Sequence, residues 1–209
     1  MDLTSPIRSV VPSAHGEVLS VLARSGQPLT GRSVAALTGG RLSVKGVNLA
    51  LRRLATAGIV LVEDHPPAKL YRLNRRHLAA DAIAALAELR PQLIEAMRAA
   101  LERWDRPAAG AWLFGSAARG DGGVESDIDV LLVRSDDSDT EDPQWTAQVE
   151  LFAEDVLAWS GNPCAIVEYS DAEFARLMAG DERLARDLRN EGIGLTPRRL
   201  PPRRPGAAP

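Results

Sequence analysis

The chain has 209 residues, of which 45% are hydrophobic, and 25 Lys and Arg stand against 28 Asp and Glu. This length suits one large domain or two small ones, and the composition excludes wholesale disorder and fibrous repeats. No window approaches about 18 consecutive apolar residues, so we expect no membrane span. No basic start leads into an apolar run, which argues against a secretory signal, and the single Cys164 fits a reduced, cytoplasmic setting.

Charge divides the chain into two parts. Residues 1–77 contain 11 basic and 4 acidic residues, whereas residues 78–209 contain 14 basic and 24 acidic ones. Such asymmetry indicates two modules with different partners. A basic module would approach a polyanion, and an acidic module would repel one unless metal ions intervene.

The basic part reads as three helices followed by a β-hairpin. Apolar residues recur at helical spacing, and Thr30 and Ser43 stand where helix caps are expected. The predicted elements are helices over 14–24, 31–37 and 44–57 and strands over 59–63 and 69–73. This order is that of a helix-turn-helix with a β-wing.

The third predicted helix carries two stripes of different character. The apolar stripe, expected to face the core, is Val44, Val47, Leu51 and Leu54. A polar stripe lies about a third of a turn away. Its Lys and Arg side chains can neutralise phosphates, and its Asn and Arg side chains can also read base edges. With the wing, the candidate DNA-binding residues are Lys45, Asn48, Arg52, Arg53, Lys69 and Arg72. The alternatives are a solvated helix face, or a module for protein contacts or dimerisation.

The segment from Ala14 to about Arg76 resembles winged helix-turn-helix DNA-binding domains. Residues 54–60 look like the end of their recognition helix entering the wing. The resemblance implies DNA contact through the third helix and implies no operator sequence. Since winged helices often bind DNA as dimers, it is also compatible with a homodimer.

A glycine-rich segment followed by two aspartates lies in the acidic part. Residues 110–133 read GAWLFGSAARGDGGVESDIDVLLV. The apolar runs 111–114 and 128–133 predict two buried strands, and residues 117–119 predict a helical turn between them. The predicted order is strand, glycine turn, short helix, strand.

Each part of this segment has a use in binding phosphate and metal. Gly115 lets the backbone approach a phosphate, and Ser116 adds a hydroxyl donor where a helix opens. Asp127 and Asp129 are two apart on a strand, so both carboxylates point to one face. Such a pair can hold two Mg²⁺ ions that position a nucleophile and a leaving pyrophosphate. The simpler interpretation is an exposed acidic strand end beside a glycine loop.

Competing motifs do not fit this segment. Gly115 and Gly120 have the glycine spacing of a P-loop, but Asp121 stands where a lysine is required. Ser116 lacks the elbow motif of a hydrolase, and the acidic part contains no histidine to activate a serine. One cysteine and no suitably paired histidines argue against a zinc site.

These residues resemble the nucleotidyltransferase superfamily that includes DNA polymerase β and the bacterial minimal nucleotidyltransferases. Its pattern is a hydrophobic residue, Gly, then Gly or Ser, about ten residues, and Asp-hydrophobic-Asp-hydrophobic. Residues 114–116 and 127–130 satisfy every position, and Arg119-Gly120 and Ser126 match the fuller form of minimal members. The resemblance implies a triphosphate site at Gly115 and Ser116, supported by Arg119 and Ser126, and a Mg²⁺ site at Asp127 and Asp129.

The family adds a third carboxylate on a neighbouring strand. Residues 163–169 read as that strand, and its only acid is Glu168, on the same face as Cys164 and Ile166. The resemblance makes Glu168 a candidate third metal ligand or general base. The alternative is a surface acid at a strand end. Asp171 fits the start of the next helix better.

The expected fold class combines α+β and α/β: a winged helix-turn-helix followed by a small nucleotidyltransferase domain with a mixed β-sheet flanked by helices. The expected domains are 1–77 (DNA-binding), 78–106 (helical connector), 107–196 (nucleotidyltransferase) and 197–209 (disordered, basic, proline-rich tail). In the connector, Arg90 should leave the helical region because Pro91 follows it, which predicts two helices or one kinked helix. The acidic run 136–142 reads as a solvated loop.

The leading functional hypothesis is a Mg²⁺-dependent nucleotidyltransferase tethered to a DNA-binding module. It would move NMP from an NTP to an acceptor hydroxyl of a protein, an RNA or a small molecule. The alternative is a transcriptional regulator whose weakly active or inactive nucleotidyltransferase domain senses nucleotide. A third hypothesis is an antitoxin-like protein that nucleotidylates a partner protein.

Overall fold

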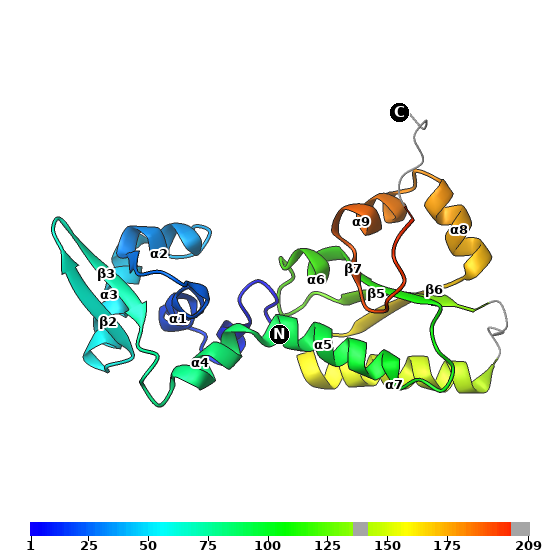
Figure 1. The fold of residues 1–209 in the computed structure, drawn as a ribbon, viewed down its shortest axis with the longest axis horizontal. Helices are drawn as coiled ribbons and strands as arrows, with labels where there is room; N and C mark the ends of the chain where they lie inside the picture. The colour runs from blue at the N-terminus through cyan, green and yellow to red at the C-terminus, as the bar shows by residue number, and fades with distance from the viewer. Residues whose placement is uncertain (136–141, 202–209) are drawn as a thin grey trace. The chain divides into compact units, whose positions relative to one another are not determined.

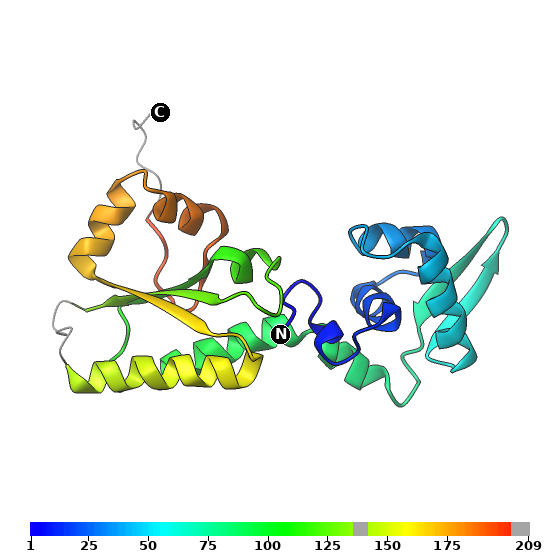
Figure 2. The ribbon, with the colours of Figure 1, turned by 180° about the vertical axis from the view of Figure 1, so that it is seen from behind.

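The structure, a computed structural model, describes residues 1–135 and 142–201. They form two compact units (Figures 1 and 2). The basic unit comprises Thr4–Arg90 together with Asp2, and the acidic unit comprises the chain from Pro91 onward together with Met1 and Leu3. Each unit has a β-sheet of its own.

The basic unit contains helices and a small antiparallel sheet. Its elements are η1 (Pro6–Ser9), α1 (Ala14–Arg24), β1 (Leu29–Thr30), α2 (Gly31–Leu37), α3 (Val44–Thr56), β2 (Val60–His65), β3 (Ala68–Leu73) and α4 (Ala80–Ala87). The expected caps are present: the Thr30 hydroxyl accepts from the Ser33 N–H, and the Ser43 hydroxyl accepts from the Gly46 N–H. The three predicted helices are therefore confirmed, and η1 and β1 are additions.

The hairpin of the basic unit is longer than predicted. Strands β2 and β3 pair from Val60↔Leu73 to His65↔Ala68, so only Pro66 and Pro67 turn the chain. Strand β1 joins the outer side of β3, which gives the order β1-β3-β2. The predicted five-residue loop was wrong because backbone pairing continues through residues whose side chains face solvent.

The core of the basic unit confirms most of the predicted apolar stripe. Val47 and Leu51 on α3 are fully buried and Leu54 nearly so, against residues of α1, α2 and the hairpin. Val44 is the exception, with 43% of its surface exposed. It is the first residue of α3, one turn before the buried residues begin.

Residues 78–106 form two helices, as predicted, but the break is not at Arg90. Helix α4 ends at Ala87 and α5 (Leu89–Glu102) starts two residues later. Arg90 is therefore helical, and Pro91 is the third residue of α5. A proline is tolerated in the first turn of a helix because the N–H groups there have no partner within the helix.

The acidic unit is a mixed four-stranded sheet with helices on both faces. Besides most of α5, its elements are β4 (Gly110–Phe114), α6 (Gly115–Arg119), β5 (Ile128–Arg134), α7 (Pro143–Ser160), β6 (Cys164–Ser170), α8 (Asp171–Ala179), α9 (Arg183–Glu191) and β7 (Ile193–Gly194). The strand order is β6-β5-β4-β7, with β5 and β6 parallel and the other pairs antiparallel. The expected mixed sheet flanked by helices is thus present.

The two faces of this sheet have separate cores. Val130 and Leu132 of β5 pack with α5 and α7 on one face, together with Trp145 and Phe152. Leu131 and Val133 pack with α8 and α9 on the other face (Figure 2). Because side chains alternate along a strand, the parity of a residue number in β5 decides which face it joins.

The first residues of the predicted disordered tail, 197–201, include residues that pack against the acidic unit. Arg198 forms an ion pair with Asp171 at 2.5 Å and lies over the Phe174 ring, and Leu200 packs on the core beside α8. Residues 202–209 of that predicted tail, and residues 136–141 of the predicted acidic loop, lie outside the described residues. Asp142, the last residue of the acidic run, caps α7 by accepting from the Gln144 N–H.

Candidate nucleotide site and candidate DNA interface

The candidate nucleotide site lies where β4 ends and β5 begins. Phe114, the last residue of β4, pairs directly with Asp129 on β5. Gly115 follows with a φ of +67°, a conformation that L side chains rarely adopt. A Cβ atom at Gly115 would lie 2.3 Å from the Asp129 Oδ2. The backbone of the glycine turn is therefore packed against one of the two carboxylates.

The two carboxylates interact electrostatically. Burial raises the pKa of Asp129, the negative charge of Asp127 raises it further, and Arg119 acts in the opposite direction. Burial and the charge of Asp129 also raise the pKa of the Cys164 thiol to about 12, which makes this cysteine an inert thiol at neutral pH. The site thus concentrates negative charge that a bound cation would relieve.

The loop before β5 folds over Ser116. A Cβ atom at Gly122 would lie 3.0 Å from the Ser116 Oγ and 3.4 Å from the Ser126 Cβ. The Ser126 hydroxyl accepts from the Gly123 N–H at 2.9 Å. Ser116 and Ser126 therefore both lie beside Gly122, in space that a side chain at this position would enter.

The Asn162 side chain holds this loop in place through hydrogen bonds. This residue was not identified from the sequence. Its side chain is fully buried, and its Nδ2 donates to the carbonyls of Ser126, Gly123 and Val124 at 2.9, 3.2 and 3.3 Å. In the sequence it stands between Gly161 and Pro163 and reads only as a turn.

Arg119 is tied to two acids at the end of α6. Its Nε donates to Asp121 at 3.0 Å and its Nη1 donates to Glu191 at 2.6 Å. Both acceptors raise the pKa of the guanidinium. Glu191 ends α9 and has no motif around it, so only the structure reveals this partner.

The structure overturns the prediction that Glu168 completes the site. In the parallel β5–β6 ladder, Glu168 lies opposite Leu132, whereas Asp129 lies opposite Ala165. Residues paired in a parallel ladder point to the same face, so Glu168 and Asp129 point to opposite faces of the sheet. The Glu168 carboxylate instead accepts from the Trp145 indole at 2.5 Å and lies 3.7 Å from Arg134.

Two carboxylates, Asp127 and Asp129, remain at the candidate site. Among the described residues no group of three or more His, Cys, Asp or Glu could hold a metal ion. Asp127 and Asp129 offer carboxylate oxygens, the ligands that Mg²⁺ prefers together with substrate phosphates. The position opposite Asp129 on β6 is Ala165, which supplies no ligand.

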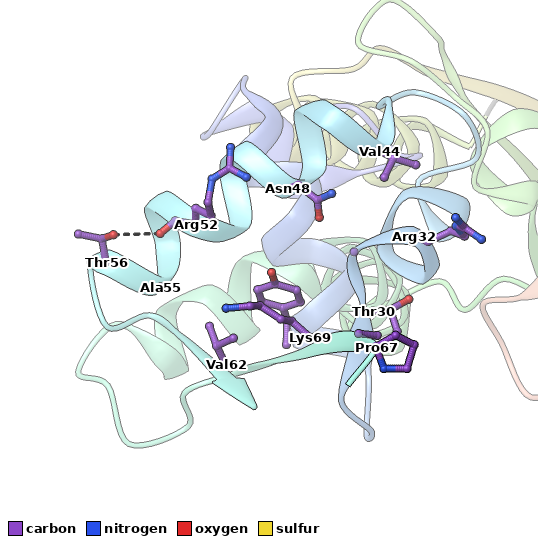
Figure 3. A pocket seen from close by; sticks show the side chains of 13 residues that line it. Thr30, Arg32, Val44, Asn48, Arg52, Ala55, Thr56, Val62, Pro67 and Lys69 are labelled. Carbon is purple, nitrogen blue, oxygen red and sulfur yellow. Dashed lines mark hydrogen bonds between the residues drawn. The ribbon is translucent and has the colours of Figure 1, made fainter. Parts of the chain in front are cut away.

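The basic unit has a groove between α3 and the hairpin (Figure 3). Its volume is about 830 Å³. Asn48 extends from α3 toward the hairpin, on which Val62 and Lys69 lie (Figure 3). The lining residues that bear on nucleic-acid binding are Arg32, Asn48, Arg52, Lys69 and Tyr71. Arg32, at the start of α2, is a groove residue that sequence reasoning did not select.

The candidate DNA-binding residues do not all share this groove. Asn48, Arg52 and Lys69 line it, whereas Lys45, Arg53 and Arg72 do not. Lys69 and Arg72 are three apart on β3, so they point to opposite faces of the hairpin. Arg72 is also paired with Glu63 at 2.8 Å. The candidate residues Lys69 and Arg72 therefore lie on different faces of the hairpin.

One comparison with known proteins gave a match in the acidic unit. Residues 93–187 match the family model described as "Nucleotidyltransferase domain". This match contains Gly115, Ser116, Asp127 and Asp129, and it supports placing the segment in the nucleotidyltransferase superfamily. A search of curated proteins gave no match. In the described part of the chain, no helix combines the length and the apolar character that crossing a membrane requires.

Proposed function

We propose that this protein is a Mg²⁺-dependent nucleotidyltransferase that moves NMP from an NTP to an acceptor hydroxyl. The observation that carries the proposal is the packing of the Gly115 turn against Asp129, beside Asp127. That arrangement puts accessible backbone for a phosphate next to two carboxylates for a cation. The family match supports general nucleotidyl transfer, and the metal and the roles of individual residues are our proposal.

The proposed roles follow from the contacts of each residue. Asp127 and Asp129 would hold Mg²⁺, which supplies charge neutralisation for the triphosphate when bound. Ser116 would donate its hydroxyl to a phosphate oxygen, and Ser126 and Asn162 would keep the loop around Gly122 in place. Arg119 would support phosphate by exchanging one of its acidic partners for the substrate.

Transfer of label from α-labelled NTPs tests this proposal. Incubation with Mg²⁺ should label an acceptor or the protein itself and release pyrophosphate. An Asp127→Ala/Asp129→Ala variant should lose the signal. Undiminished labelling by that variant would refute the assignment of the site.

A second candidate function is a nucleotide sensor with little catalysis. The observation in its favour is Glu168, which lies on the face of the sheet opposite Asp129 and so cannot act there as a general base. A sensor would bind Mg²⁺ and NTP through the same two aspartates but release no pyrophosphate. Measuring NTP binding and pyrophosphate release on one sample separates the two functions.

We further propose that the basic unit is a winged helix-turn-helix domain that binds DNA. Its helices, followed by the β2–β3 hairpin, give the expected order of elements, and Asn48 and Arg52 lie on α3 beside the groove. No ion pair involves Lys45, Arg32 or Arg52 within the described ranges, so their charges are available to phosphate. Arg72, being paired with Glu63, is not part of the proposed surface.

Two variants on α3 and a control variant on β3 test the DNA proposal. Arg52→Ala and Lys45→Ala should each weaken duplex binding. Each should also reduce the magnitude of the slope of log K against log salt concentration by about one, the value for one lost phosphate contact. Arg72→Ala is the matched control and should change binding little. Equal losses for all three would contradict the proposed surface.

A further inference from the structure

The open edge of the sheet in the acidic unit lies beside the two aspartates. Strand β6 ends the order β6-β5-β4-β7 and pairs only with β5. It runs along the near side of the sheet, between α7 and α8 (Figure 2). Val167 on this strand keeps 38% of its surface exposed.

The backbone of β6 offers a row of free hydrogen-bonding groups. The Ile128 N–H donates to the Pro163 carbonyl at 2.8 Å, so odd-numbered residues of this stretch turn their backbone groups toward β5. The N–H and C=O groups of Cys164, Ile166 and Glu168 therefore point away from the sheet. Within residues 1–135 and 142–201, no backbone or side-chain group pairs with them.

Resting on the proposed transferase function, we propose that β6 docks the acceptor as an extended polypeptide segment that adds a strand to this edge. Ala165 lies directly opposite Asp129, so a strand added to β6 places one residue about 10 Å from Asp129, two strand spacings away. A Ser, Thr or Tyr at that position, on the face that Asp129 shares, carries its hydroxyl toward the carboxylates. The short Ala165 side chain leaves the path open.

The charge of the unit favours a polypeptide over a nucleic acid as acceptor. Residues 91–209 of this unit contain 22 acidic and 13 basic residues. A nucleic-acid acceptor would be repelled by this field, whereas a neutral or basic peptide would not. Main-chain pairing to a sheet edge supplies affinity without requiring one sequence. The proposed acceptor is therefore a hydroxyl-bearing, neutral or basic segment of another protein.

Labelling of arrayed peptides by the full-length protein tests this proposal. Each ten-residue peptide carries one central Ser, Thr or Tyr flanked by Val and Lys, and its twin has Pro at alternate flanking positions. With α-labelled NTPs and Mg²⁺, the strand-forming peptides should be labelled at least tenfold more than their Pro twins. Equal labelling of both sets would overturn the proposal.

Two variants at one position separate backbone pairing from packing. Ile166→Pro removes an outward N–H, which an edge strand tolerates, and should lower peptide labelling at least tenfold with unchanged binding of a fluorescent NTP. Ile166→Ala loses the same side-chain packing but keeps the N–H, and should label peptides like the wild type. Equal labelling by both variants overturns the proposal.

Three further outcomes distinguish failure of the acceptor-docking proposal from failure of the proposed transferase function. The wild type could be a dimer that Ile166→Pro converts to monomers while peptide labelling stays unchanged. This result would show that β6 is a contact between two copies of the chain, and it would overturn the proposed docking of the acceptor. Pyrophosphate release that depends on Asp127 but labels no peptide would overturn the acceptor proposal and leave the transferase intact. No pyrophosphate release with any acceptor would overturn both.

Discussion

Asp129 is the central residue of the proposed site, and its environment disfavours its charged form. Burial, followed by the charge of Asp127, raises its pKa. The folded protein therefore holds a proton on Asp129 at a pH where the unfolded chain has lost it. Without a cation, the free energy of unfolding falls as the pH rises from the ordinary aspartate pKa through the raised one.

Asp129→Asn should accordingly stabilise the metal-free protein at pH 7. The melting temperature should rise relative to the wild type, and the difference should vanish near pH 3, where both forms are neutral. Thermal unfolding followed by circular dichroism at the two pH values measures this. Glu154→Gln, which changes an exposed carboxylate on α7, is the control and should have little effect. A lower melting temperature for Asp129→Asn at pH 7 would contradict the argument.

Gly115 is the second central residue of the proposed site, for steric reasons. An Ala at this position takes a left-handed conformation and brings a Cβ atom to 2.3 Å from the Asp129 Oδ2. Gly115→Ala should cost about 1–3 kcal/mol of stability and displace the carboxylate, so Mg²⁺-dependent NTP binding should weaken. Urea unfolding and fluorescent-NTP titration measure the two effects. Gly123→Ala is the control, because a Cβ atom there meets nothing within 4 Å.

Among the elements, the β5–β6 pair decides which acids meet. Asp127 directly precedes β5 and lies close enough to Asp129, the second residue of the strand, for its charge to raise the pKa of Asp129. Residues on adjacent strands share a face only if the register allows it, and Glu168 is one position out of phase with Asp129. The same parity separates Lys69 from Arg72 on β3.

Glu168→Gln should leave nucleotidyl transfer within about twofold of the wild type. The neutral amide oxygen still accepts from the Trp145 indole, so the packing of β6 on α7 is retained. If Glu168 were the general base, its loss would lower the rate of nucleotidyl transfer about 10²- to 10⁴-fold. Steady-state pyrophosphate release measures the difference. A hundredfold lower rate of pyrophosphate release would instead indicate that Glu168 takes part in the reaction.

For the whole molecule, the cores are separate. One cluster of buried residues lies entirely within the basic unit, and two others, one on each face of the four-stranded sheet, lie within the acidic unit. Each unit therefore has its own source of stability. The proposed ligands are also different, with Mg²⁺ and NTP for one unit and DNA for the other.

Calorimetry should therefore show two unfolding transitions. Mg²⁺ and NTP at about 100 times the dissociation constant should stabilise only one transition, by about 2.7 kcal/mol, or on the order of 10 °C. Duplex DNA should shift only the other. A single transition that both ligands shift together would show that the units unfold as one.

The sequence alone determined the features that obey local rules. Capping by Thr30 and Ser43 predicted the helices, and the glycine motif predicted a turn at Gly115 between two buried strands. The tertiary structure decided the features that depend on register and on distant segments. It turned Glu168 to the opposite face, placed Ala165 across from Asp129, and brought Asn162 and Glu191 to the loop and to Arg119. The physical reason is that a strand's own periodicity is encoded locally, whereas its phase relative to a neighbouring strand is set by hydrogen bonds between segments far apart in the chain.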